Sequence, residues 1–406
     1  DYPRVQGLAE MMNSYGVIHN DAEVVSKIVA SQAHHKKIDG HAPGLQGKDL
    51  DTYVAAGVYS DHECATMEDA LAKLQRGQFI MIREGTAARN LEALAPLLTP
   101  QYAERCMFCT DDKHPSDLLE KGHIDYIARE AINKYGVDPI IAVKAACHHA
   151  SRYFLLNNRG AIAPGYLADF AVIDNFKDFN VEMVFKKGVL YWNNGELRDF
   201  EAPKIEEYLD KRAHDTFHVS TLTPDDFRDT RQRGVLGMVP GEIITTDNGY
   251  ADHVDLEKDI LKIAVVERHK GTHHIGLGYI QGYGLKSGAV ATSISHDSHN
   301  IIVVGTNSAD MAFAANYIVE HHGGIVVVEN GTVKGSVVLE IAGITSDRPL
   351  TEVNDQLEAA KDAAFTLGVS RGIDPFMTLS FMALPVIPKL RITTRGVVDV
   401  DTQQYV

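Results

Sequence analysis

The sequence has no apolar run near the roughly 20 residues that a transmembrane helix needs, no segment that resembles a signal peptide, and little cysteine. We therefore expect a cytoplasmic protein without a membrane partner. The four cysteines among 406 residues are too few for a disulfide framework, and their apolar neighbours predict buried thiols. Positive charge is also scarce: the formal net charge of −16 is spread along the chain, which argues against a nucleic-acid partner.

Two of the cysteines, Cys106 and Cys109, have the CxxC spacing of zinc and redox sites. In an extended strand, however, side chains three positions apart point to opposite faces of the sheet. We therefore expect no metal or disulfide between them.

The remaining composition is that of a globular protein, with 45% hydrophobic and 23% charged residues. A chain of this length holds two or three domains. The sequence opens DYPRVQGLAE without an initiator methionine, and we expect it to be a piece of a longer protein.

Short strand-like runs alternate with amphipathic helical stretches up to about residue 160, which predicts βα units and a parallel sheet. The helical stretches include 21–36, 47–57 and 66–77, where apolar residues recur at helical spacing. The expected strands lie in GLAEMM, KIDGHA, GVYSDHE, FIMIREG and CMFCTDD.

Polar residues cluster at the carboxyl ends of these five strands. They are Glu10, His41, His62 with Glu63, Arg83 with Glu84, and Asp111 with Asp112. An open doubly wound sheet places ligands only near its switch point, whereas a (β/α)8 barrel builds its site from successive strand ends. We therefore predict that residues 1–163 form a partial (β/α)8 TIM-type barrel in which three of the eight strands are missing.

The rest of the chain changes character. Residues 138–154 read as a helix on which His148 and His149 are structural. Residues 164–204 contain short strands separated by turn signals, which predicts a small β-sandwich segment and linker. Residues 205–406 predict an α+β domain, with strands such as ILKIAVVER and a helix that begins near Asn307 and Ser308.

Two histidines, a glutamate and an aspartate from different strand ends form a plausible divalent metal site. Imidazole and carboxylate ligands suit Zn, Mn or Fe, and a carboxylate can bridge two metals. A metal held in this way lowers the pKa of water and supplies hydroxide for attack on an electrophilic carbon. Asp111 is the natural acceptor of the proton from that water.

Several stretches carry a resemblance to the adenine deaminases of the amidohydrolase superfamily. In the first half these are LAEMMNSYGV, IDGHAPGL, SDHE, IREGTAARNL and FCTDDKHPSDLL, and GAIAPGYLADFAVID is similar to the superfamily's return to its small β domain. In the second half, SGAVATSISHDSHNIIVVG and PFMTLSFMALPVIPKLRITTRG resemble the family's C-terminal domain. The resemblance implies hydrolysis of adenine to hypoxanthine and ammonia by a divalent metal pair, with Mn most expected and Fe or Zn possible.

The resemblance also implies a role for each strand-end residue. Glu10 is expected to bridge the metals, His41 and His62 to be ligands, and Asp111 to bind metal and carry the proton. Asp112 is expected to contact the purine. Glu63 is expected either to protonate a ring nitrogen or to orient His62.

Arg83 and His296 are further candidates for substrate binding, and each has a structural alternative. Arg83 can simply pair with Glu84, and His296 can be a hydrogen-bonding turn residue in SHDSHN. Similarly, Asp111 and Asp112 can cap the helix that follows them.

The sequence departs from the family in one respect, because it contains no HxH motif of the kind that the family carries on its first barrel strand. One metal would then lack two protein ligands, so the chain itself could be inactive. The alternatives to adenine deamination are another cyclic amidine or amide hydrolase of the superfamily, or a purine-binding protein without activity. Because an open barrel exposes sheet edges, we expect association with the missing segment or with a second copy, most simply as a homodimer.

Overall fold

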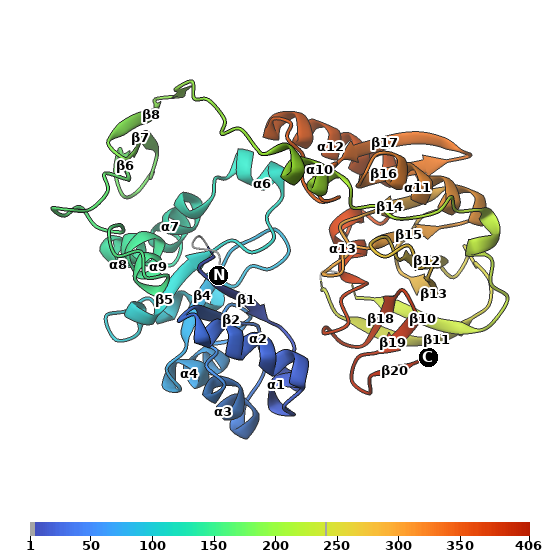
Figure 1. Cartoon of the computed structure of the whole chain (residues 1–406), viewed down its shortest axis with the longest axis horizontal. Helices are drawn as coiled ribbons and strands as arrows, with labels where there is room; N and C mark the ends of the chain where they lie inside the picture. Colours follow the sequence, from blue (N-terminus) through green and yellow to red (C-terminus); the bar gives the residue numbers. More distant parts are fainter. Residues whose placement is uncertain (1–4, 240–241) are drawn as a thin grey trace. The chain divides into compact units, whose positions relative to one another are not determined.

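The computed structural model describes residues 5–239 and 242–406. The chain forms two compact units that divide between Ala202 and Pro203 (Figure 1). Within the two described ranges, none of the helices has the length and apolar character needed to cross a bilayer.

The first unit contains all five strands that the alternating pattern predicts. They are β1 (Gly7–Met11), β2 (Lys37–Gly40), β3 (Ser60–Asp61), β4 (Phe79–Arg83) and β5 (Cys106–Cys109). β1 pairs with β2, and β3, β4 and β5 pair in that order, in each case parallel. The backbone N–H of Tyr59 donates to the carbonyl of Ile38 at 2.9 Å and links the two groups. The strands therefore follow one another in chain order, and their carboxyl ends lie at one edge.

Helices lie between these five strands and after the last of them. They are α1 (Ser14–Ile18), α2 (Ala22–Ala33), α3 (Gly47–Ala55), α4 (Met67–Gln75), α5 (Leu91–Leu94), α6 (Pro115–Glu120), α7 (Ile124–Asn133), α8 (Pro139–Val143) and α9 (His149–Tyr153). α2 begins where the side chain of Asp21 accepts hydrogen bonds from two backbone N–H groups, which is a typical N-cap. α2 contacts β1 and β2, and α4 contacts β4; both helices are drawn below these strands in the view of Figure 1.

The predicted helix over 138–154 is present, with a π-helical turn over Lys144–His148 between α8 and α9. His149 is buried, and its Nδ1 lies 2.9 Å from the carbonyl oxygen of Cys106, which agrees with a structural role. Cys64 and Cys106 are buried as predicted, whereas Cys109 is only partly buried and Cys147 is exposed, so the expectation of four buried thiols is wrong for these two. Cys147 lies on the outward side of the helix, where apolar neighbours in the sequence do not bring burial.

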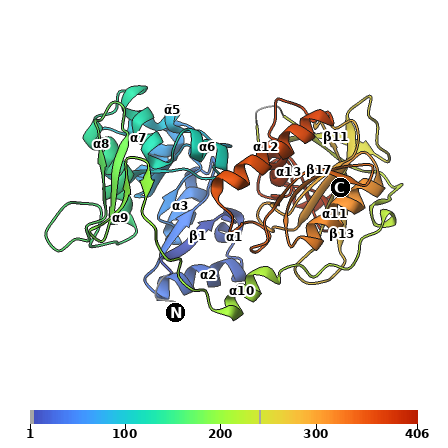
Figure 2. The same ribbon diagram turned by 90° about the horizontal axis from the view of Figure 1, so that it is seen from above.

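The small sheet of the first unit contains β6 (Phe170–Ile173), β7 (Val181–Lys186), β8 (Val189–Asn193) and β9 (Glu196–Leu197). These strands pair antiparallel in sequence order as a single sheet. No residue of the four strands is fully buried. Ile173 and Phe179 pack into the core that includes residues of α7 and α8, and the sheet lies beside α8 in Figure 2.

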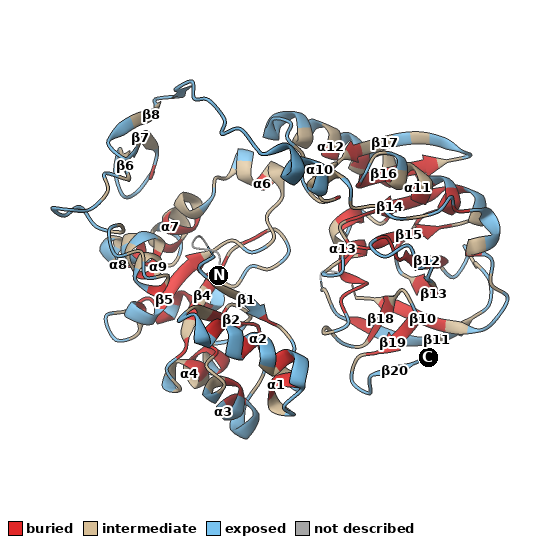
Figure 3. Cartoon of the chain, in the orientation of Figure 1, coloured by how far each residue is buried: buried red, intermediate tan, exposed pale blue. Residues whose placement is uncertain are grey.

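The second unit is built around an eight-stranded sheet and a three-stranded sheet. Its strands are β10 (Arg233–Met238), β11 (Thr245–Ala251), β12 (Ile260–Val266), β13 (Ile275–Gln281), β14 (Ala289–Thr292), β15 (Ile301–Gly305), β16 (Gly324–Glu329), β17 (Thr332–Val338), β18 (Leu390–Thr393), β19 (Gly396–Asp399) and β20 (Gln404–Tyr405). The large sheet has the order β11-β10-β13-β12-β15-β14-β16-β17, and only β10 and β13 pair parallel. Figure 3 shows that its central strands are buried.

Three helices of the second unit pack on this sheet: α11 (Ser308–Glu320), α12 (Leu350–Thr366) and α13 (Pro375–Phe381). A further helix, α10 (Glu207–His214), precedes the sheet and has no buried residue. α11 begins at the predicted cap, where Asn307 accepts from the N–H of Asp310, and packs against Val326 and Val328 of β16. α12 packs against β16 and β17. An added Cβ at Gly335 of β17 would lie 2.8 Å from the Cα of Ala360, so this glycine permits the close contact.

Candidate metal centre

The candidate residues of the first unit lie at or just beyond the carboxyl ends of their strands. Glu10 is the fourth residue of β1, His41 directly follows β2, and His62 directly follows β3. Arg83 is the last residue of β4, and Asp111 lies two residues beyond β5. Because the strands are parallel and adjacent, these positions meet at one edge of the strands.

Glu10, His41 and His62 form a first group. A ligand atom from each lies within 4.8 Å of the others. His41 Nδ1 is 3.3 Å from Glu10 Oε2, and His62 Nε2 is 3.7 Å from the same oxygen. Two imidazole nitrogens and a carboxylate oxygen at these separations can all reach one ion at the bond lengths of about 2.0–2.2 Å typical of zinc.

The burial and hydrogen bonding of His41 support a role as a metal ligand. Its side chain is 10% exposed, and its Nδ1 makes no hydrogen bond within the described residues. The contact with Glu10 is within ion-pair distance but lacks hydrogen-bond geometry. A buried nitrogen without a partner is costly in a folded protein, and coordination of a cation would satisfy it. The donor set therefore fits a divalent metal.

His62, Glu63 and Asp111 form a second group, again with ligand atoms within 4.8 Å. His62 Nε2 is 3.3 Å from Glu63 Oε1. Asp111 belongs to this group and not to the first, so the four predicted ligands meet as two groups that share His62.

Arg83 links the two carboxylates of the second group. Its guanidinium donates to both oxygens of Glu63 and, at 2.7 Å, to Asp111 Oδ2. Its Nε donates to Asn90 Oδ1 at 2.7 Å. The alternative pairing with Glu84 is therefore wrong for Arg83; Glu84 instead accepts a hydrogen bond from the N–H of Leu91.

These charges shift the pKa values of the group. Burial alone would lower the pKa of His62, but its hydrogen bond with Glu63 and the charge of Glu10 outweigh burial and raise the value to about 9. Burial would raise the pKa of Glu63, whereas its hydrogen bond with His62 and the charge of Arg83 lower it to about 2. Glu63 is therefore a carboxylate at neutral pH.

The backbone at two of the strand ends adopts an uncommon conformation. Glu10 has a φ of 24° and Asp111 a φ of 56°, in the region that residues other than glycine rarely occupy. The neighbouring Gly85 has little space, because an added Cβ would lie 2.3 Å from the carbonyl oxygen of Thr110. Such strain often accompanies functional positions.

Other candidates lie elsewhere. Asp111 and Asp112 do not cap α6, whose N-cap is His114 without a side-chain cap hydrogen bond. His296 belongs to the second unit, where its ring stacks on Phe381 with centroids 4.7 Å apart and its Nδ1 lies 2.8 Å from Asp297 Oδ1.

Three buried residues near the two groups were not predicted from the sequence: Tyr53, Asp61 and Lys73. Tyr53 accepts a hydrogen bond from the backbone of His41, and Asp61 accepts one from Glu63. A signal was present for Lys73, which lies three residues after Ala70 on the buried side of α4. A lysine on an apolar helical face requires a buried acceptor.

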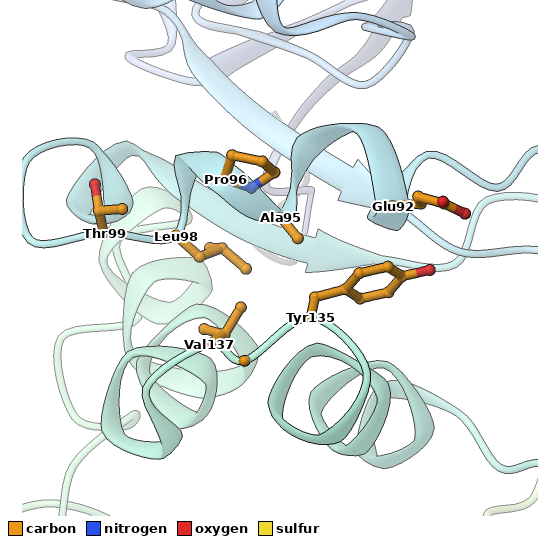
Figure 4. A pocket seen from close by; sticks show the side chains of 8 residues that line it. Glu92, Ala95, Pro96, Leu98, Thr99, Tyr135 and Val137 are labelled. Carbon is orange, nitrogen blue, oxygen red and sulfur yellow. The ribbon is translucent and has the colours of Figure 1, made fainter.

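A pocket of about 360 Å³ lies elsewhere in the first unit, between the segments around Leu98 and Val137. Figure 4 shows Tyr135 and Val137 on one side of it and Ala95 and Leu98 on the other. It contains none of the strand-end residues and is not part of the candidate centre.

The chain is similar in sequence to known proteins along its whole length. Residues 5–191 match the family model "Amidohydrolase family", and residues 242–404 match "Adenine deaminase C-terminal domain". The "Adenine deaminase" of Desulfatibacillum aliphaticivorans is 44% identical over 414 residues, which cover 100% of this chain and 72% of that protein. The "Adenine deaminase" of Nitratidesulfovibrio vulgaris strain DP4 is also 44% identical, over 419 residues that cover 100% of this chain and 71% of that protein.

The chain belongs to the adenine deaminase family. Its first unit therefore has the α/β fold of the amidohydrolases, and membership of that family implies a divalent metal. Among solved structures, a beta-aspartyl dipeptidase from Fervidobacterium islandicum AW-1 is 16% identical with a TM-score of 0.39, covering 49% of this chain and 61% of that one.

Proposed function

We propose that the chain hydrolyses adenine to hypoxanthine and ammonia. The observation that carries the proposal is the match of the whole chain, at 44% identity, to a protein named adenine deaminase. The first unit supplies supporting chemistry, since Glu10, His41 and His62 bring the donor types of a metal-dependent hydrolase together.

The proposed ligands are Glu10, His41, His62 and Asp111, arranged around two metal positions. Glu10, His41 and His62 would hold one ion, and Asp111, which groups with His62 and Glu63, would contribute to a second. Mn is the metal proposed, and Fe or Zn suit the same imidazole and carboxylate donors. When bound, such a metal supplies Lewis acidity that makes hydroxide available at neutral pH.

Asp111 is the proposed proton acceptor. Its Oδ2 accepts from Arg83 and its Oδ1 from the N–H of Asp112, so the carboxylate is held in one orientation. In this role Asp111 takes the proton from the attacking water and returns it to the leaving amino group as ammonia departs. The other proton of the water ends on ring nitrogen N1. The C–O bond forms at C6 and the C–N bond breaks, so that adenine and water give hypoxanthine and ammonia.

For Glu63 we propose the orienting role. As a carboxylate it accepts from Arg83 and lies beside His62, which suits orientation of the histidine.

Substrate contacts are proposed for Asp112, Arg83 and His296. Recognition of adenine needs matched donors and acceptors, and Asp112 supplies an acceptor beside the proposed catalytic aspartate. The donors of Arg83 that face Glu63 and Asp111 favour a role in aligning these carboxylates around the substrate.

The proposed layout is a (β/α)8-type barrel contributed by residues 1–163, followed by the small β segment 164–204 and the α+β domain 205–406. Five parallel strands in chain order support this proposal, because they would be consecutive strands of such a barrel.

The test is ammonia release from adenine by the purified chain supplied with Mn²⁺. The proposal predicts that wild type releases ammonia from adenine and that Asp111→Asn does not. Adenosine and guanine, tested in place of adenine, should release no ammonia. A metal-loaded, folded chain that releases no ammonia from adenine would refute the proposed activity.

A further inference from the structure

A buried network lies behind the candidate metal centre and contacts the backbone beside three of the proposed ligands. Its side chains come from β3, α3 and α4, and its central members, Tyr53, Asp61 and Lys73, are each fully buried. None of them is among the proposed ligands. Their hydrogen bonds end on backbone groups of the ligand-bearing strand ends.

Tyr53 connects the ends of β1 and β2. Its hydroxyl donates to the carbonyl oxygen of Met11 at 2.6 Å and accepts from the N–H of His41 at 2.9 Å. Met11 directly follows Glu10 in the chain. One phenol oxygen therefore fixes the separation between the strand ends that carry Glu10 and His41.

Asp61 connects the ends of β2 and β3. Its Oδ1 accepts from the N–H of Ala42 at 2.7 Å, and its Oδ2 accepts from the N–H of Glu63 at 2.9 Å. Ala42 follows His41, and Glu63 follows His62. The single carboxylate therefore holds the residue after each histidine.

Lys73 completes the network from α4. Its ammonium donates to the carbonyl oxygen of Ala42 at 2.8 Å, to Asp61 Oδ2 at 3.0 Å and to Asp69 Oδ2 at 2.9 Å. All three donors of the ammonium are thus used. Asp61, Cys64 and Asp69 resemble a cation site by spacing, but the ammonium of Lys73 already lies among them.

The close packing of the strand ends agrees with this arrangement. An added Cβ at Gly40, the residue before His41, would lie 2.2 Å from the carbonyl oxygen of Ser60 and 3.1 Å from the hydroxyl of Tyr53. The strand ends approach one another too closely for any other residue at this position. Because the strand ends pack so closely, a small shift of Tyr53 or Asp61 should also shift the backbone of the histidines.

We propose that Tyr53, Asp61 and Lys73 are positioning residues that hold His41 and His62 at the spacing a divalent metal requires. The inference rests on the proposed metal site. The network binds backbone groups and not the imidazole rings. It therefore sets the positions of the backbone that carries the ligands, and not the protonation of the histidines. Groups that orient metal ligands typically change metal affinity by about 10- to 100-fold when they are removed.

The first test compares Tyr53→Phe with Tyr283→Phe. Tyr283 is also fully buried, and its hydroxyl donates to the carbonyl oxygen of Pro375 at 2.8 Å in the second unit. Both variants keep the ring and lose a buried hydroxyl. Metal-depleted protein is titrated with Mn²⁺ against a competing chelator, and the melting temperature is measured without metal.

The expected result is an Mn²⁺ dissociation constant that rises about tenfold or more in Tyr53→Phe and stays within twofold of wild type in Tyr283→Phe. An unchanged affinity in Tyr53→Phe would overturn the inference, as would an equal loss in both variants at equal loss of melting temperature.

The second test compares Asp61→Asn with Asp69→Asn. Each variant removes one carboxylate partner of Lys73, but only Asp61 holds the N–H groups of Ala42 and Glu63. The inference predicts the larger loss of Mn²⁺ affinity in Asp61→Asn, and the reverse order would contradict it.

Adenine turnover of the wild-type chain is measured in parallel and separates the two claims. Wild type that binds Mn²⁺ and shows the predicted order of variants without adenine turnover refutes the proposed activity alone. Wild type that deaminates adenine while Tyr53→Phe binds metal normally refutes the positioning role alone.

Discussion

Arg83 and Asp111 form an ion pair at 2.7 Å, and the same guanidinium also binds both oxygens of Glu63. The side chains of Arg83 and Glu63 are 9% and 10% exposed, whereas that of Asp111 is 25% exposed. One cation thus holds two carboxylates, of which Asp111 is the more exposed.

Replacement of this cation should be costly. We expect Arg83→Met to lower the free energy of unfolding by about 3–5 kcal/mol, because it leaves the largely buried carboxylate of Glu63 without its partner. Adding Glu63→Gln to the same chain should recover part of the loss, since the amide is neutral. Urea unfolding of the two single variants and the double variant measures the coupling. Additive losses would show that the pair does not interact.

Gly85 should be intolerant of a side chain. In Gly85→Ala the new Cβ would meet the carbonyl oxygens of Thr110 at 2.3 Å and Asp112 at 2.6 Å, so the Asp111 loop must move. We expect lower thermal stability and a fall of roughly tenfold or more in kcat/KM for adenine.

Gly372→Ala is the matched control for Gly85→Ala. Its nearest neighbour would be Ser370 Oγ at 3.8 Å, an ordinary contact. Equal behaviour of the two variants in thermal melts and adenine kinetics would argue against tight packing behind Asp111.

The stability of the second unit should fall in acid through Glu267. Burial would raise the pKa of this carboxyl, but hydrogen bonds from the Thr272 N–H and hydroxyl and from the N–H groups of Lys270 and His269 lower it to about 2 from an ordinary value of 4.5. A carboxyl with a lowered pKa stabilises the folded state above its ordinary pKa, and this contribution is lost as the pH falls through 4.5 toward 2.

Glu267→Gln should therefore weaken the pH dependence of unfolding between pH 5 and about pH 2.5. Glu257→Gln, at an exposed position ten residues earlier, is the control and should behave as wild type. Denaturant unfolding at each pH gives the comparison. A wild-type slope in Glu267→Gln would contradict this explanation.

The cysteines should differ in reactivity. Cys147 is exposed, whereas Cys64 and Cys106 are buried, and burial raises the pKa of Cys106 to about 12. We expect a thiol reagent at pH 8 to label Cys147 first in the native chain, and Cys64 and Cys106 only on unfolding. Peptide mapping after brief labelling identifies the site, and early labelling of Cys64 would show that its core opens readily.

The strands of the first unit were predictable because apolar runs and helical periodicity alternate regularly there. β13 was not predicted, since Gly276 and Gly278 interrupt its run and glycine has low strand propensity. The structure explains both glycines: a Cβ at Gly276 would lie 1.9 Å from the carbonyl oxygen of Thr393, and one at Gly278 would lie 2.4 Å from Val397. The hairpin of β18 and β19 requires this close approach, and it comes from more than 100 residues further along the chain.

In the candidate centre, too, contacts between residues far apart in the sequence could not be predicted from the local pattern. His41 and His62 stand out in the sequence because polar residues at strand ends are unusual and because they lie in recognisable stretches. Tyr53 does not, since a tyrosine on the apolar side of an amphipathic helix reads as core. Only the paired strand ends reveal that its hydroxyl lies between Met11 and His41.

The central claim is that Glu10, His41 and His62 hold a divalent metal, and Mn²⁺ binding to the metal-depleted chain tests it most directly. Free Mn²⁺ is measured by its paramagnetic resonance signal during titration of wild type, His41→Ala and His62→Ala, with exposed His253→Ala as the control. The account predicts tight binding by wild type and the control, and a loss of at least about 100-fold in affinity in the two ligand variants. Equal binding of Mn²⁺ by all four proteins would contradict it.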